Sequence, residues 1–112
     1  VITIDENKAK DYQNTPDFIQ QYIFPGGMLP TKKQFEISAK NVGLKCIENL
    51  SFGTSYAKTL KIWNNQFQKS WSDLSKFGFD NKFKRMWEFY LSYCETGFSN
   101  NSTDVSHYLI QK

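Results

Sequence analysis

Apolar residues recur along this chain with two different periods, which predict short strands alternating with amphipathic helices. Strands are expected over Val1–Ile4, Leu44–Leu50 and Val105–Ile110, with two helices in each interval between them. This order is typical of an α/β fold with crossover connections. Three short strands are too few to cover four helices on both faces. We therefore expect part of the sheet to lie outside these residues, before Val1.

The first interval carries two sets of helix signals. Residues 5–12 are polar and predict a loop or a loose helix. A helix start is predicted at Thr15-Pro16-Asp17, followed by an apolar face of Phe18, Ile19, Tyr22 and Ile23 that ends at Pro25-Gly26-Gly27. Thr31 and Gln34 have the spacing of a capping box, and Gly43 stands where a left-handed residue ends a helix.

The second interval predicts a pair of long amphipathic helices. From Thr54 the apolar positions return at a helical period, at Tyr56, Leu60, Trp63, Phe67, Trp71 and Leu74. Phe77-Gly78-Phe79 interrupts the pattern, and Asp80 is expected to cap the next helix. The apolar face of that helix consists of Phe83, Met86, Trp87, Tyr90, Leu91, Cys94 and Phe98. Because 17% of all residues are aromatic, we expect bulky core layers or an aromatic-lined cleft.

Length and composition limit the class of protein. The 112 residues correspond to one domain or a piece of a larger one, and 39% apolar residues are enough for a packed core. No apolar run is long enough to span a membrane and no leader precedes the first strand, so we expect a cytoplasmic protein. Cys46 and Cys94 form no CxxC pair and are expected to be reduced thiols. The single His107 lacks partner ligands, so we expect no bound metal.

The net charge of +3 permits an anionic partner without requiring one. Lys82, Lys84 and Arg85 cluster near one predicted helix start, and Lys32 and Lys33 near another, where cations oppose the helix dipole. These groups are interpreted either as a solvated face or as contacts to anionic lipid headgroups. Lysines also alternate with aromatics over residues 56–71, but those aromatics have helix-core spacing, so we expect no nucleic-acid partner.

Motifs for several kinds of chemistry are absent from the sequence. It holds no GxGxxG or Walker loop for nucleotide phosphates, no GxSxG elbow, and only one histidine for a Ser-His-Asp set. Any small molecule that binds through a glycine-rich turn must therefore bind outside these 112 residues.

Two longer motifs carry a family resemblance: YIFPGGMLP over residues 22–30 and FGTSYAKTLKIW over residues 52–63. Together with FKRMW at 83–87 and the Tyr90, Leu91 and Cys94 that follow, they resemble the C-terminal part of cyclopropane-fatty-acyl-phospholipid synthases and mycolic acid cyclopropane synthases. The resemblance implies that residues 1–112 are the C-terminal portion of a single class I methyltransferase domain, which is Rossmann-like. The expected strands would be its fifth, sixth and antiparallel seventh. The S-adenosylmethionine site would lie in the absent half of the sheet.

The resemblance also implies a reaction, the transfer of a methylene from S-adenosylmethionine to a cis double bond of a phospholipid acyl chain. A methyl group moves from the sulfonium to the alkene, a carbocation forms, a proton leaves and the ring closes. Such a reaction needs closely held geometry and aromatic faces that shield the cation. In the family the base is a bound bicarbonate.

Four residues match positions of the family's site. Tyr56 matches the tyrosine that hydrogen-bonds bicarbonate, Phe24 matches an aromatic residue beside the reacting centre, and Gly26 and Gly27 would let the backbone approach the acyl chain. Each also has a structural explanation, as the first core residue of a stripe, a core phenylalanine and a plain turn. Cys94 matches a cysteine near the active site and is assigned no step. The other bicarbonate ligands lie outside these residues, so the piece alone is expected to be inactive.

The resemblance further implies an unsaturated phospholipid acyl chain at the membrane surface as substrate, for a bacterial, peripherally membrane-associated protein. An open strand edge and apolar patch predict a homodimer or swapped dimer of the isolated piece. Two alternatives stay open. One is a non-catalytic helical module for lipid binding or protein interaction, and the other is a related methyltransferase that acts on a small molecule.

Overall fold

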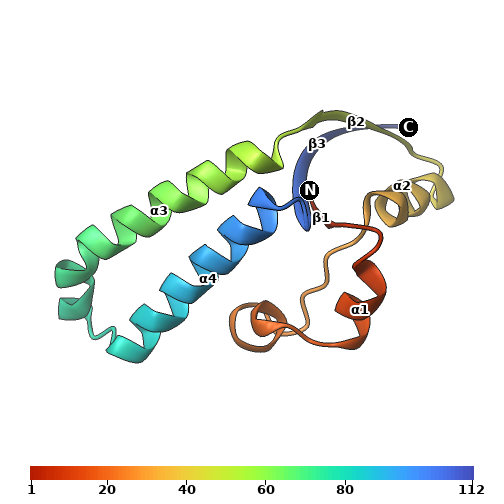
Figure 1. The fold of residues 1–112 in the computed structure, drawn as a ribbon. Helices are drawn as coiled ribbons and strands as arrows, with labels where there is room; N and C mark the ends of the chain where they lie inside the picture. Colours follow the sequence, from red (N-terminus) through yellow and green to blue (C-terminus); the bar gives the residue numbers. More distant parts are fainter.

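The computed structural model describes residues 1–112 with the exception of the side chain of Asn49. Its segments are β1 (Ile2–Ile4), α1 (Ala9–Asn14), the π-helical turn η1 (Ile19–Ile23), α2 (Lys32–Asn41), β2 (Lys45–Ser51), α3 (Gly53–Leu74), the 3-10 turn η2 (Ser75–Phe77), α4 (Asn81–Ser99) and β3 (Thr103–Gln111). In Figure 1 the α3–α4 hairpin extends to one side of the strands, and α1 and α2 lie on the other. The expected helix-rich α/β fold with about three strands is confirmed.

The three strands form one sheet in which the last strand of the sequence is central. β3 pairs antiparallel with β1, where Ile2 opposes Val105, and antiparallel with β2, where Lys45 opposes Gln111. β1 and β2 therefore run parallel to each other on either side of β3, and a crossover through α1 and α2 connects them. The antiparallel last strand agrees with the expected fold class.

The helix starts and ends predicted between β1 and β2 are observed, except that one helical segment starts two residues later than predicted. The predicted capping box starts α2, and Gly43, with φ of 77°, follows its end. Of the polar stretch at 5–12, the part from Ala9 onward joins α1. The helix start predicted at Thr15 is wrong by two positions, because Asp17 and Gln20 each accept a hydrogen bond from the other's backbone N–H. This reciprocal pair satisfies two free amides at once, and the helical segment that follows is a single π-helical turn.

α3 and α4 form an antiparallel hairpin, and Figure 1 shows them side by side. Asp80 caps α4, as predicted, by accepting a hydrogen bond from the Phe83 backbone N–H at 2.8 Å. Gly78 takes the left-handed conformation, with φ of 92°, in the turn between the two helices. None of the described helices is long and apolar enough to cross a bilayer.

The core lies where the hairpin meets the sheet. Its buried side chains are Ala57, Leu60, Leu91 and Phe98, and Ile2, Tyr56, Phe67, Tyr90, Cys94 and Val105 pack around them. Other positions on the predicted stripe of α3 are less covered, and Trp63 is 46% exposed. The helical period predicted the correct face, but a single partner helix covers only part of it. The predicted dimer of the isolated piece, which would bury such exposed aromatic surface, stays a prediction.

Candidate active site

The IFPGG motif lies between η1 and α2 and packs against α4. The Phe24 ring is edge-on to the ring of Tyr90, with centroids 6.3 Å apart. Just before the motif, Phe18 is edge-on to Phe89 at 4.6 Å. These two contacts hold a segment of the connection between β1 and β2 against α4.

The two glycines of the motif are explained by a local turn. Gly26 has φ of 79°, a conformation that residues with a Cβ rarely adopt. Gly27 donates its backbone N–H to the Phe24 carbonyl oxygen at 2.9 Å, and a Cβ at Gly27 would lie 3.0 Å from the same oxygen. The turn therefore favours glycine at both positions. The approach of an acyl chain to these glycines stays a prediction.

Tyr56 combines a packed ring with an open hydroxyl. It lies in the first turn of α3, and its ring is edge-on to Phe98 at 5.0 Å and to Trp63 at 5.9 Å. Among the described residues no hydrogen bond engages its hydroxyl, and that oxygen is not one of the buried polar atoms left without a partner. The structural and functional interpretations of Tyr56 are therefore compatible. The ring completes the core while the hydroxyl stays available to a ligand.

Tyr90 and Cys94 lie one turn apart on α4, beside Tyr56. Burial raises the pKa of Tyr90 to about 12, and the neighbouring Cys94 and Tyr56 add to the shift. Burial also raises the pKa of the Cys94 thiol to about 11, although a hydrogen bond with Tyr90 acts in the opposite direction. The sequence placed Tyr90 on an apolar face and among the residues of the family resemblance, but gave it no role at a site. Its spacing of four residues from Cys94 puts the two side chains on the same side of a helix.

We call Phe24, Tyr56, Tyr90 and Cys94 the aromatic site. The ring of Trp87, edge-on to Tyr90 at 5.2 Å, extends it along α4. Aromatic rings at such a site attract a positive charge, and the hydroxyls and thiol can donate hydrogen bonds. Tyr90 and Cys94 keep their protons at neutral pH, since their ordinary pKa values already lie above 7 and burial raises them further. Neither can accept a proton there, so a base would have to be another group.

The raised pKa of Cys94 makes a prediction about its reactivity. The thiolate is the nucleophile, and a pKa of about 11 in place of 9.0 lowers the thiolate fraction at pH 8 by about 100-fold. Alkylation of Cys94 by iodoacetamide is expected to be slower by about that factor in native protein than in urea-unfolded protein. Mass spectrometry of the Cys94 peptide measures both rates, and equal rates would contradict the burial of this thiol.

Two other residues that the sequence singled out, His107 and Lys32, contact residues outside the aromatic site. His107 lies on β3, with its ring edge-on to Phe52 at 4.8 Å. Lys32 is ion-paired with Glu48 at 2.7 Å and with Asp104 at 2.8 Å. The cation at the start of α2 is therefore explained by two ion pairs within the protein. Neither earlier interpretation, a solvated face or a contact to lipid headgroups, included them.

The basic cluster at the start of α4 is divided between two environments. Lys84 pairs with Glu88 at 3.7 Å and lies over the Trp71 ring at 5.6 Å. Lys82 and Arg85 are exposed. These two are therefore the members of the cluster that an anionic surface could reach without breaking a described ion pair.

Comparisons with known proteins agree with the resemblance. The profile of the family described as mycolic acid cyclopropane synthetase matches residues 1–108. The chain is 39% identical over 105 residues to tuberculostearic acid methyltransferase UfaA1 of Mycobacterium tuberculosis, covering 93% of this chain and 25% of that protein. It is 33% identical over 86 residues to the cyclopropane-fatty-acyl-phospholipid synthase of Escherichia coli K12, covering 76% of this chain and 22% of that protein. The chain thus spans about a quarter of the length of these bacterial relatives.

Solved structures have the same fold over the whole chain. The cyclopropane synthase MmaA2 from Mycobacterium tuberculosis matches with a TM-score of 0.84 at 24% identity, covering 100% of this chain and 42% of that one. Mycolic acid cyclopropane synthase CmaA1, in a complex with SAH and CTAB, matches with a TM-score of 0.83 at 24% identity, covering 99% and 42%. The predicted fold class is therefore confirmed, and the chain belongs to the mycolic acid cyclopropane synthetase family.

Proposed function

We propose that the whole protein transfers a methylene from S-adenosylmethionine to a cis double bond of a phospholipid acyl chain. In this proposal residues 1–112 are the C-terminal portion of its single methyltransferase domain. The observation that carries it is the aromatic site, where two family motifs and α4 bring together an open phenol, aromatic rings and neutral donors. Family membership and the name of the E. coli relative support the substrate class.

The residues present fit a bound bicarbonate. The Tyr56 hydroxyl is an open donor in the first turn of α3, where the helix dipole favours an anion. A bicarbonate there would supply the base that Tyr90 and Cys94 cannot provide. Phe24 and Tyr90 would present their rings to positive charge on the acyl chain, and Gly26 and Gly27 would allow close approach of the backbone. S-adenosylmethionine, the methyl donor, would bind outside these residues.

The test is label transfer by the full-length protein, expressed with the coding sequence that precedes Val1. Methyl-labelled S-adenosylmethionine is incubated with vesicles of cis-unsaturated phospholipid, and vesicles of saturated phospholipid are the control. Label is expected in the lipid extract from unsaturated vesicles alone. An extract without label from either would reject the lipid substrate, and label in a water-soluble product would favour the small-molecule methyltransferase.

A second outcome of the same chemistry is methyl addition without ring closure. It is favoured by the 39% identity to a relative that is named a methyltransferase. Nuclear magnetic resonance of the labelled lipid distinguishes the two products, because cyclopropane protons resonate upfield of ordinary chain protons. Ring signals support the synthase, and a branched methyl signal supports the alternative.

We also propose that the whole protein contacts an anionic membrane surface through the tip of the α3–α4 hairpin. Phe77 is 80% exposed there, and Lys82 and Arg85 lie exposed at the adjacent start of α4. Exposed aromatic residues and cations together suit the headgroup region of a bilayer. The tip could therefore bring the protein to the surface that holds its substrate.

Charge reversal at this tip gives a test. Each cation near an anionic surface contributes about 1 kcal/mol, so the full-length Lys82→Glu/Arg85→Glu variant is expected to bind anionic vesicles at least about tenfold more weakly. Co-sedimentation with phosphatidylglycerol vesicles measures this. The matched control is Lys58→Glu/Lys61→Glu, which reverses two exposed cations in the half of α3 next to the strands. Equal losses in the two variants would mean that the tip has no special role.

A further inference from the structure

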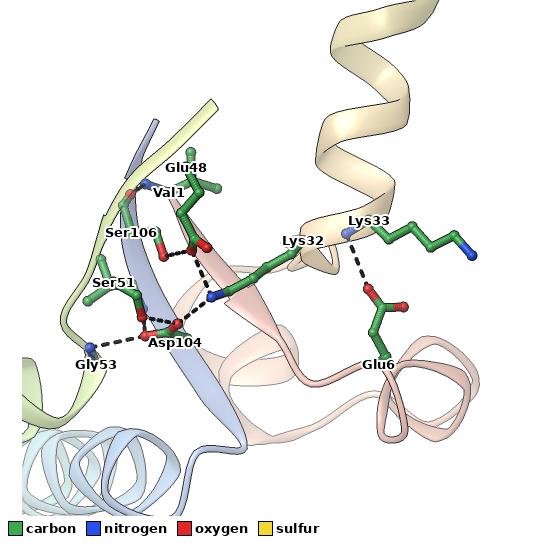
Figure 2. A network of polar contacts seen from close by, with 10 residues as sticks. Val1, Glu6, Lys32, Lys33, Glu48, Ser51, Gly53, Asp104 and Ser106 are labelled. Carbon is green, nitrogen blue, oxygen red and sulfur yellow. Dashed lines mark hydrogen bonds and ion pairs between the residues drawn. The ribbon is translucent and has the colours of Figure 1, made fainter. Parts of the chain in front are cut away.

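A polar network joins α2, β2 and β3 on the side of the strands opposite to the hairpin tip. Figure 2 shows the Lys32 ammonium between two carboxylates, 2.7 Å from Glu48 Oε1 and 2.8 Å from Asp104 Oδ2. Ser106 Oγ donates to the same Glu48 oxygen at 2.5 Å. The first residue of α2 is thereby tied to both strands.

Asp104 also caps α3 from a distant part of the sequence. The Gly53 backbone N–H, the first of α3, donates to Asp104 Oδ1 at 3.0 Å, and Ser51 Oγ donates to Oδ2 at 2.5 Å (Figure 2). The residue in the N-cap position, Phe52, supplies no side-chain hydrogen bond. A helix N-terminus needs acceptors for its free amides and favours negative charge, and a strand residue 51 positions away provides both.

The contact between α3 and Asp104 leaves no room for a side chain. A Cβ built on the buried Gly53 would lie 2.6 Å from Asp104 Oδ1 and 3.3 Å from Asp104 Cα. In addition, the Phe52 backbone N–H donates to the Val105 carbonyl oxygen at 3.0 Å. The start of α3 is therefore fixed against β3 by two hydrogen bonds and by close packing.

Asp104 is ionised at neutral pH. Burial acts against its ionisation, but hydrogen bonds from Lys32, Ser51 and the Val105 backbone N–H outweigh burial and hold the pKa of its carboxyl below the usual value. Hydrogen bonds to Asp104 and Glu48 likewise raise the pKa of Lys32 against the effect of burial. The carboxylate that caps α3 therefore carries a negative charge at neutral pH.

We propose that Asp104 is a positioning residue for Tyr56. Tyr56 donates its backbone N–H to the Phe52 carbonyl oxygen at 3.1 Å, which closes the first turn of α3. Asp104 fixes the beginning of that turn through Gly53, so it sets where the phenol at the end of the turn lies. The inference rests on the proposed function, in which Tyr56 holds the base.

A double-mutant cycle in the full-length protein tests this role. Asp104→Ala is expected to lower kcat about tenfold or more with little change in KM for phospholipid, because a small displacement of a positioned group has large kinetic effects. Asp104→Asn should restore much of the loss, since its amide oxygen can still accept from Gly53. Tyr56→Phe/Asp104→Ala should be no slower than Tyr56→Phe alone, because Asp104 acts through the lost hydroxyl.

Two variants separate positioning from a loss of folding. Gly53→Ala keeps Asp104 but displaces its carboxylate from the start of α3, because the added Cβ would lie 2.6 Å from Oδ1. This variant should lower kcat as Asp104→Ala does. Asp80→Ala removes the equivalent aspartate cap from α4, and it should lower the melting temperature by a similar amount without a change in kcat. Additive losses in the double mutant, or a kcat of Asp104→Ala that equals the wild type, would overturn the proposal.

If the wild-type protein transfers no label, the proposed function fails and the positioning is judged by hydrogen exchange. The amides of Gly53 and Tyr56 should exchange at least about tenfold faster in Asp104→Ala than in wild type, while those of α4 stay unchanged. Unchanged exchange at both amides would reject Asp104 as the residue that fixes this turn. The two proposals therefore fail by different measurements.

Discussion

Replacing Tyr56 with phenylalanine in the full-length protein is expected to lower kcat by about 100-fold or more. General-base catalysis contributes about 10²–10⁴ to the rate, and the substitution removes only the hydroxyl that is proposed to hold the base. The ring can keep its edge-on contacts with Phe98 and Trp63, at 5.0 and 5.9 Å, so stability should change little. Initial rates of label transfer to unsaturated phospholipid, at saturating and limiting lipid, give kcat and KM.

The proposed binding of bicarbonate by Tyr56 is tested by a second measurement, the dependence of activity on bicarbonate concentration. In buffer depleted of carbon dioxide, added bicarbonate should restore wild-type activity at lower concentration than it restores any residual activity of Tyr56→Phe. The matched control is Tyr108→Phe, which removes a buried hydroxyl on β3 with no hydrogen-bond partner among the described side chains. It should leave kcat unchanged. A fully active Tyr56→Phe would reject the assignment of Tyr56, and bicarbonate curves that coincide would reject the anion.

Replacing Phe98 with alanine is expected to destabilise the fold by about 3–5 kcal/mol. Phe98 is 3% exposed and belongs to the buried cluster with Ala57, Leu60 and Leu91. The loss includes the burial of the ring and a cavity that neighbouring helices cannot close, since interiors are closely packed. Denaturant titration of the full-length protein, followed by tryptophan fluorescence, measures the change.

Exposure of the side chain decides the size of this effect. Phe77→Ala removes the same ring from the hairpin turn, where Phe77 is 80% exposed, and should change stability by about 0.5 kcal/mol or less. Phe98→Ala should also reduce kcat, because the Tyr56 ring loses an edge-on partner at 5.0 Å. A loss of less than about 1 kcal/mol for Phe98→Ala would contradict a core located between α3, α4 and the sheet.

Local signals in the sequence predicted most of the elements, because their physical causes act over a few residues. The capping box of α2, the Asp80 cap of α4 and the left-handed Gly43 are present as expected. The start at Thr15 was wrong because Asp17, two positions later, forms a reciprocal pair of hydrogen bonds with Gln20. Periodicity also identified the apolar faces of α3 and α4, but could not show how little of them a single partner helix covers.

The sequence predicted the aromatic site only in part. Phe24 and Tyr56 were assigned to the site through family motifs, whereas Tyr90, although part of the resemblance, was assigned no role there. Its position between Phe24 and Cys94 depends on a contact between the first crossover and α4. The cap that Asp104 provides to α3 spans 51 positions, and no pattern of neighbouring residues encodes such a pair.

The central place of β3 has a consequence for how the chain folds during synthesis. β1 and β2 each pair with β3, and β3 is made after both. A ribosome therefore releases two strands, a crossover and a helical hairpin before the strand that joins them exists. Native closure of the sheet, and with it the Asp104 cap on α3, must wait until β3 has left the exit tunnel. Until then exposed strand edges are open to partners such as chaperones.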